Sequence, residues 1–128
     1  ELALYEKAPD EVIVTLEEME ECGFGEKPVW GSLVAEVDGN VEGIALHYDR
    51  YSTWKGRRLY LEDLIVTEKM RGSGIGKLLL DELIVYGKAN NYHGMVWQVL
   101  DWNEPAINFY KKYNADFDPE WINVSVNF

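Results

Sequence analysis

Cysteine and histidine are almost absent from this sequence. Its 128 residues include one cysteine, Cys22, and two histidines, His47 and His93. A single thiol cannot form an intramolecular disulfide, and so few thiol and imidazole groups argue against a thiolate cluster or another transition-metal site. We therefore expect no disulfide framework, no metal cofactor and a cytoplasmic location.

Long apolar runs and excess positive charge are also missing. Hydrophobic residues make up 47% of the chain, yet no apolar run approaches the ~20 residues that span a bilayer, so no membrane partner is expected. The net charge of −11 argues against nucleic acid, whose phosphates need a basic surface, and favours cationic partners. Seven of the twelve Lys and Arg residues lie between positions 50 and 77. That basic segment suits a phosphate-bearing ligand, although acidity elsewhere is explained equally well by solubility.

A glycine-rich turn is the most informative feature present. Residues 71–76 read Arg-Gly-Ser-Gly-Ile-Gly and separate a strand-like run, residues 59–66, from a helix-like run, residues 75–89. Backbone N–H groups at such a junction bind anions, helped by the positive end of the helix dipole. The spacing matches neither a P-loop nor the G-x-G-x-x-G of a dinucleotide fold. It fits Arg/Gln-x-x-Gly-x-Gly, and a glycine-rich helix start without any ligand remains an alternative.

The order of predicted elements indicates one mixed α+β domain over residues 1–128. We expect a helix end at residues 1–7. A short helix is expected to begin at Thr15, which forms a capping box with Glu18, and to end near Glu21. Strands are expected at residues 29–37 and 41–48, joined by an Asp38-Gly39-Asn40 turn, and at 59–66, 94–100 and 121–128. Helices follow at 75–89 and after Asn103, an N-cap with Pro105 in the first turn.

Several segments in this order resemble the GNAT superfamily of acetyl-CoA-dependent N-acetyltransferases, and within it the spermidine/spermine (diamine) and thialysine acetyltransferase group. They are residues 1–6, 23–26, 33–36, 51–57, 60–63, the glycine turn, and 101–110, which read Asp-Trp-Asn-Glu-Pro-Ala-Ile-Asn-Phe-Tyr. The resemblance implies a mostly antiparallel central sheet flanked by helices and splayed at the cofactor site. It also implies a homodimer. The apolar run at residues 121–128 agrees with this, because an open edge strand of this kind is usually covered by a partner. The family has a further strand and most of a helix before Glu1, a continuation after Phe128, and a longer segment between Asp116 and Trp121.

The resemblance also implies roles for individual residues. Tyr110 would be the general acid beside the sulfur, although a tyrosine on an amphipathic helix is usually a core residue. Glu62 would bind the amine and pass its proton on, the alternative being an ion pair with Arg57 or Arg58. Asp63, the adjacent strand residue, is expected on the opposite face of the sheet. Tyr5, Glu6 and Glu120 would complete the amine site. The cofactor would be held by Leu64, Ile65, Val66, Arg71, Gly72, Ser73, Gly74, Ile75, Gly76, Lys77, Asn103, Glu104, Pro105 and Ala106.

The expected activity is acetyl transfer from acetyl-CoA to a primary amine of a small polycationic substrate. Direct attack is favoured because Cys22, the only thiol, lies in the acidic N-terminal part and no serine stands in a nucleophilic setting. Two other functions stay open at this point. One is a protein or peptide lysine acetyltransferase, and the other is a non-catalytic CoA-binding module.

Overall fold

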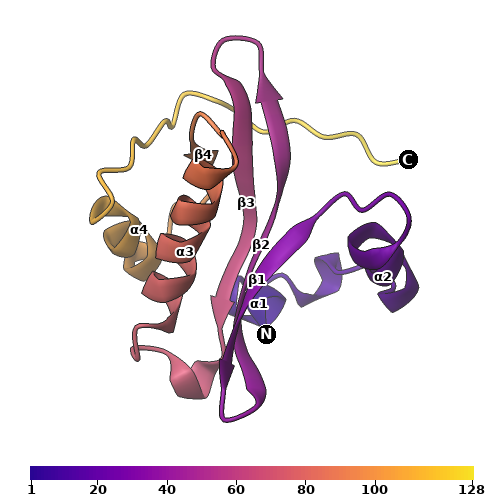
Figure 1. The fold of residues 1–128 in the computed structure, drawn as a ribbon, viewed down its shortest axis with the longest axis vertical. Coiled ribbons are helices and arrows are strands. Elements are labelled where there is room, and N and C mark those ends of the chain that lie inside the picture. Colours follow the sequence, from indigo (N-terminus) through magenta and orange to yellow (C-terminus); the bar gives the residue numbers. More distant parts are fainter. The chain divides into compact units, whose positions relative to one another are not determined.

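The computed structural model describes residues 1–128 and separates into two compact units, residues 1–98 and 99–128, which we treat one at a time. The first unit is built on a four-stranded sheet in the order β1-β2-β3-β4 (Figure 1). Its strands are β1 (Gly31–Val37), β2 (Asn40–Ser52), β3 (Gly56–Val66) and β4 (Met95–Val96). The first three pair antiparallel and β4 joins β3 in parallel, which confirms the predicted mixed sheet.

Two tight turns set the register of the antiparallel strands. Asp38 and Gly39 have φ angles of 52° and 81°, and Val37 pairs directly with Asn40. Two consecutive residues with positive φ match the twist of a hairpin, so the predicted turn is confirmed. The β2–β3 turn is closed by Ser52, whose Oγ accepts hydrogen bonds from the N–H groups of Trp54 at 3.2 Å and Lys55 at 3.1 Å. The two strands extend to this turn, so both are longer than the sequence predicted.

The hydrophobic core lies between the sheet and α3 (Ile75–Ala89), whose bounds match the prediction. Leu59 of β3 and Leu80 and Leu83 of α3 are fully buried. Burying each such leucine stabilises the fold by about 1.5–3 kcal/mol. Ala45, Leu61, Ile75 and Leu79 complete this layer. The helix packs on β1, β2 and β3, and it therefore holds the glycine turn at its own N-terminus against the sheet.

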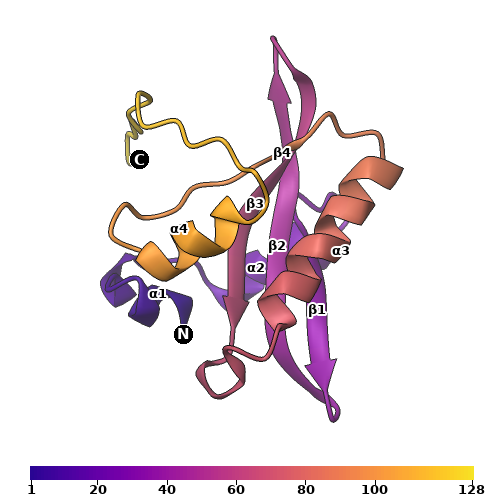
Figure 2. The ribbon, with the colours of Figure 1, turned by 90° about the vertical axis from the view of Figure 1, so that its left-hand side faces the viewer.

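The N-terminal segments lie on the opposite side of the sheet from α3 (Figures 1 and 2). They are α1 (Leu2–Tyr5), the 3-10 helix η1 (Pro9–Glu11) and α2 (Leu16–Phe24). The predicted cap of α2 is confirmed, since Thr15 Oγ1 accepts a hydrogen bond of 3.1 Å from the N–H of Glu18. The helix runs to Phe24, past the expected end near Glu21, and the ring of Phe24 packs edge-on against Trp30 with centroids 5.5 Å apart.

The second unit contains α4 (Glu104–Lys111), which begins where the sequence predicts. The expected strand at residues 121–128 is wrong, because that run has no regular secondary structure. Alternation alone cannot make a strand: its N–H and C=O groups need a neighbouring strand, and this segment pairs with none. The predicted strand at 94–100 is likewise reduced to Met95–Val96, which pair with Leu59 and Tyr60.

Candidate active site

The glycine turn leads into α3 through two residues with left-handed backbone. Gly72 and Gly74 have φ angles of 78° and 89°, and a Cβ built on either would meet no atom within 4 Å. Gly74 is the N-cap of α3 and has no side chain to accept from the first helical turn. The N–H groups of Ile75, Gly76 and Lys77 have no acceptor within the helix and are directed out of its N-terminal end. Such a set of donors can hold an anionic group.

Side chains around this turn are engaged with the protein. Arg71 Nε donates to the carbonyl of Val66 at 3.0 Å, and its guanidinium lies 5.0 Å from the centre of the Tyr5 ring. The hydroxyl of Ser73 donates to the carbonyl of Met70. Lys77 Nζ pairs with Asp81 at 2.5 Å, one turn further along α3. The geometry therefore leaves anion binding at this turn chiefly to the backbone.

Glu42 anchors the segment that connects β3 to the glycine turn. Its carboxylate accepts a hydrogen bond from Thr67 Oγ1 at 2.6 Å and pairs with Lys69 Nζ at 2.8 Å. Its backbone carbonyl also accepts from the N–H of Thr67 at 2.9 Å. The hydrogen bonds from Lys69 and Thr67 lower the pKa of Glu42, which is a buried residue. These bonds attach the segment that runs from β3 through η2 (Glu68–Met70) to the glycine turn firmly to β2.

The end of β3 presents backbone donors on the side away from β2. Thr67 bonds with Glu42, and the next hydrogen-bonded pair in an antiparallel ladder is two residues away, at Ile65 and Ile44. The intervening residues Leu64 and Val66 consequently direct their N–H and C=O groups outward. The bond from Arg71 to the Val66 carbonyl agrees with this direction. The ladder with β4 ends at Tyr60, so these outward groups lie beyond the last β3–β4 pair.

Glu62 occupies a bulge in β3. Leu46 pairs with Asp63 and His47 pairs with Leu61, so Glu62 is the extra residue between them. A bulge shifts the alternation of side chains along a strand. Leu61 is buried in the α3 layer, whereas Glu62 accepts a 2.8 Å hydrogen bond from the hydroxyl of Tyr48, on the opposite face. The bulge therefore sets the direction of the candidate catalytic carboxylate.

The same bulge overturns one prediction. Adjacent strand residues were expected to face opposite sides, but Asp63 pairs with Leu46, whose side of β2 also bears Tyr48. Glu62 and Asp63 thus share the face that is turned away from α3. The alternative of an ion pair between Glu62 and Arg57 is also wrong. Arg57 Nε instead pairs with Asp49 at 2.8 Å.

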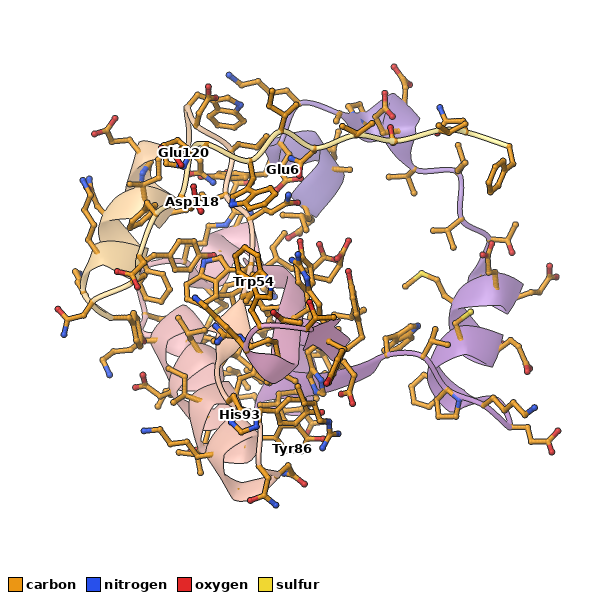
Figure 3. The ribbon with its side chains drawn as sticks, turned by 90° about the horizontal axis from the view of Figure 1, so that it is seen from above. Glu6, Trp54, Tyr86, His93, Asp118 and Glu120 are labelled. Carbon is orange, nitrogen blue, oxygen red and sulfur yellow. The ribbon has the colours of Figure 1, made fainter.

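Carboxylates gather on this face. Burial, together with the negative charges of Glu62 and Glu6, raises the pKa of Asp63. Glu6 is the C-cap of α1 and lies on the side of the sheet away from Tyr86 of α3 (Figure 3). Tyr5 lies beside Arg71 near the start of the glycine turn. Of the four residues predicted for the amine site, the first unit thus supplies three, and Asp63 joins them.

The Glu62 carboxylate is hydrogen-bonded to one of two stacked tyrosines. The rings of Tyr48 and Tyr60 stack with centroids 5.0 Å apart. Burial and the hydrogen bond to Glu62 raise the pKa of Tyr48, so its hydroxyl stays protonated and donates. Sequence reasoning did not find Tyr48 or Asp63. The signal for Tyr48 lay in its register opposite Tyr60, which only the pairing of β2 with β3 reveals.

The second unit holds the other predicted site residues. Asn103 is buried and caps α4 by accepting a 3.4 Å hydrogen bond from the N–H of Ala106. Tyr110 is buried on the same helix, beside the Phe109 ring at 5.4 Å between centroids. Glu120 is exposed, and its N–H donates to Asp118 Oδ1 at 3.1 Å. The N-cap is confirmed, while the cofactor role of Asn103 and the acid role of Tyr110 stay predictions.

Comparison with known families and proteins decides the class. The model of the acetyltransferase (GNAT) family matches residues 3–115. The chain belongs to this family. It is 40% identical over 123 residues to the thialysine N-epsilon-acetyltransferase of Bos taurus, covering 90% of this chain and 72% of that protein. It is 34% identical over 122 residues to the human spermidine/spermine N(1)-acetyltransferase-like protein 1, with 90% and 18% covered.

Solved GNAT-like structures show the same fold. An integron cassette protein from V. cholerae matches with a TM-score of 0.78 and 22% identity, covering 99% of this chain and 80% of that one. An aminoglycoside acetyltransferase from an uncultured soil metagenomic sample matches with a TM-score of 0.80 and 15% identity, with 99% and 83% covered. The predicted fold, family and reaction class of this GNAT domain are thus confirmed.

Members of the GNAT family use acetyl-CoA as co-substrate, as predicted. No group of three or more His, Cys, Asp or Glu side chains in the chain is arranged to hold a metal ion. No helix is both long enough and apolar enough to cross a bilayer.

Proposed function

We propose that this GNAT domain transfers the acetyl group of acetyl-CoA to a primary amine of a small substrate that carries a second cationic group. The observation that carries this proposal is the shared face of Glu62, Asp63 and Glu6. Burial and the neighbouring carboxylates raise the pKa of Asp63, so the cluster gains by binding positive charge, and a dication would satisfy two of its members. The printed names of two relatives, which refer to thialysine and to spermidine/spermine, support the same class of amine.

The backbone of both β3 and the glycine turn would hold acetyl-CoA. The pyrophosphate would accept hydrogen bonds from the N–H groups of the glycine turn and of the first residues of α3. The pantetheine arm would lie along the outward N–H groups at the end of β3, and one of these donors would polarise the thioester carbonyl. The segment at residues 103–106 is proposed from family resemblance as the other wall of the cofactor site.

The reaction would be a direct attack. The amine nitrogen, after losing a proton toward Glu62 through water, attacks the thioester carbonyl carbon. The C–N bond forms, the C–S bond breaks, and the departing thiolate takes a proton from Tyr110. A positioned acid or base of this kind contributes 10²–10⁴-fold, a typical range.

A panel of amines tests this proposal. We expect kcat/KM for spermidine, putrescine and thialysine to exceed that for butylamine, which has one charge. Glu62→Gln should reduce that preference by about 1–3 kcal/mol, the range for losing a hydrogen bond to a charged group. Equal rates for butylamine and the dications would remove the substrate class but keep acetyl transfer. Lysine-rich peptides outrunning all small amines would instead indicate a protein acetyltransferase, and no thiol release would indicate a CoA-binding module.

We also propose a homodimer, from family resemblance and from the exposed apolar side chains at the end of the chain. Trp121, Ile122, Val124 and Val126 are between 75% and 89% exposed. A partner that covered them would remove large apolar areas from water. Light scattering at micromolar concentration should then give twice the 14.8 kDa mass of one chain. A cytoplasmic location stays a prediction that cell fractionation would test.

A further inference from the structure

Arg50 lies on the same face of the sheet as the candidate amine site. Side chains alternate along β2, so Arg50 shares the side of Tyr48, two residues earlier. Its guanidinium lies 5.7 Å from the centre of the Tyr60 ring, the ring that stacks on Tyr48. Because the Tyr48 hydroxyl bonds to Glu62, the stacked pair of Tyr60 and Tyr48 separates this cation from the carboxylate.

The charge of Arg50 has no counter-ion. Arg57, Lys69 and Lys77 form ion pairs, with Asp49, Glu42 and Asp81, and Arg50 forms none. Although Glu62 and Asp63 share its face, Arg50 pairs with neither. An exposed arginine without a partner is ordinary on a protein surface. A binding role for Arg50 therefore depends on its position relative to a second cation.

That second cation is Arg58, which stands directly opposite Arg50 in the register of β2 and β3. Like charges opposite each other in a sheet repel, because their Cβ atoms are only about 4.5–5.5 Å apart. Arg58 Nη2 donates weakly to the Met95 carbonyl at 3.4 Å, and Arg58 Nε is buried without a partner. Arg50 is exposed, so its donors face solvent beside a second, partly buried positive charge. An exposed guanidinium in that position suits a carboxylate, which arginine recognises with paired N–H groups.

We propose that Arg50, opposite Arg58, binds the carboxylate of an amino-acid substrate and so favours lysine-like amines over polyamines. This inference rests on the proposed function, since it assumes that the reacting amine lies at Glu62. Arg58, which stands opposite Arg50, is four residues from Glu62 along β3, and four residues along a strand correspond to about 13 Å. An extended lysine with a hydrogen bond of about 3 Å at each end spans a comparable distance.

Matched pairs of amines test this assignment. Cadaverine is lysine without its carboxylate, and bis(2-aminoethyl) sulfide is thialysine without its carboxylate. We expect the wild-type protein to prefer the amino acid in each pair. Arg50→Gln should lower kcat/KM for lysine and thialysine by about tenfold to a hundredfold, the range for hydrogen bonds to a charged group, and leave the two diamines unchanged or improved.

Lys55→Gln is the matched control, because it removes the same charge from an exposed side chain in the β2–β3 turn. It should change both members of a pair equally. Equal effects of Arg50→Gln on amino acids and diamines, or a wild-type preference for the diamines, would overturn the inference. Absence of thiol release with every amine would refute the proposed function instead. Calorimetry of thialysine with CoA present, on wild type and Arg50→Gln, would then still decide whether Arg50 binds a carboxylate.

Discussion

Replacing Gly74 by valine tests whether acetyl-CoA is held by the backbone of the glycine turn. Gly74 has a φ of 89°, a left-handed conformation that costs an L-residue roughly 1–2 kcal/mol, and a β-branched side chain the upper end of that range. A Cβ at this position meets no atom within 4 Å. The free protein would therefore suffer backbone strain but no collision, and it should still fold.

The effect on CoA binding should be larger than that strain alone. The added methyl groups would stand on the residue immediately before the free N–H groups of the first turn of α3, where they would keep the pyrophosphate from approaching the backbone. We expect calorimetry to show CoA affinity reduced at least tenfold, or by ~1.4 kcal/mol. The same experiment on acetyl-CoA should give the same loss, because the acetyl group lies at the other end of the molecule.

Gly39→Val provides a matched control in the β1–β2 turn. Gly39 has a φ of 81° and also has open space where a Cβ would be placed. The strain, and hence the loss of unfolding free energy in urea, should be comparable in the two variants, while CoA affinity should fall only in Gly74→Val. Unchanged CoA affinity in a folded Gly74→Val protein, or an equal loss in both variants, would refute the backbone site.

Three further predictions concern individual side chains. Tyr110→Phe should keep CoA affinity and slow kcat by 10²–10⁴-fold, as expected for a general acid; a fall of less than about threefold with chemistry rate-limiting would make Tyr110 a packing residue. Tyr48→Phe should lower kcat/KM for dications about tenfold by freeing the Glu62 carboxylate, whereas Tyr60→Phe, which keeps the ring stack and removes a hydroxyl not bonded to Glu62, should not. Because the pKa of Glu42 is lowered in the folded state, the stability it contributes is present above the pKa of an unfolded glutamate and lost as pH falls through the folded value. The difference in urea midpoint between wild type and Glu42→Gln should therefore shrink from pH 7 to pH 4, and a constant difference would contradict the assignment.

Local sequence signals predicted the parts of this fold that form from near neighbours. Thr15 and Asn103 cap their helices, Asp38 and Gly39 turn their hairpin, and the apolar period of α3 gives its bounds correctly. Each depends on contacts within a few residues, where backbone preference and side-chain hydrogen bonds are specified by the chain itself. The glycine turn belongs to this class as well.

Local sequence signals could not predict which distant strands pair or in what register. The run at residues 121–128 has the alternation of a strand yet forms none, because strands require a neighbour that no local pattern provides. The bulge at Glu62 is likewise a property of how β3 meets β2. Counting residues along β3 alone placed Glu62 and Asp63 on opposite faces, which the extra residue reverses.

The sequence by itself determined the family, the reaction class and the position of the glycine turn, since these depend on contiguous residues with fixed spacing. Tertiary structure alone decided which charges share a face. It placed Tyr48 on Glu62, Asp63 near Glu6 and Arg50 opposite Arg58. The physical reason is that electrostatic partnership depends on distance through space, and the register of β2 against β3, with its one bulge, sets those distances.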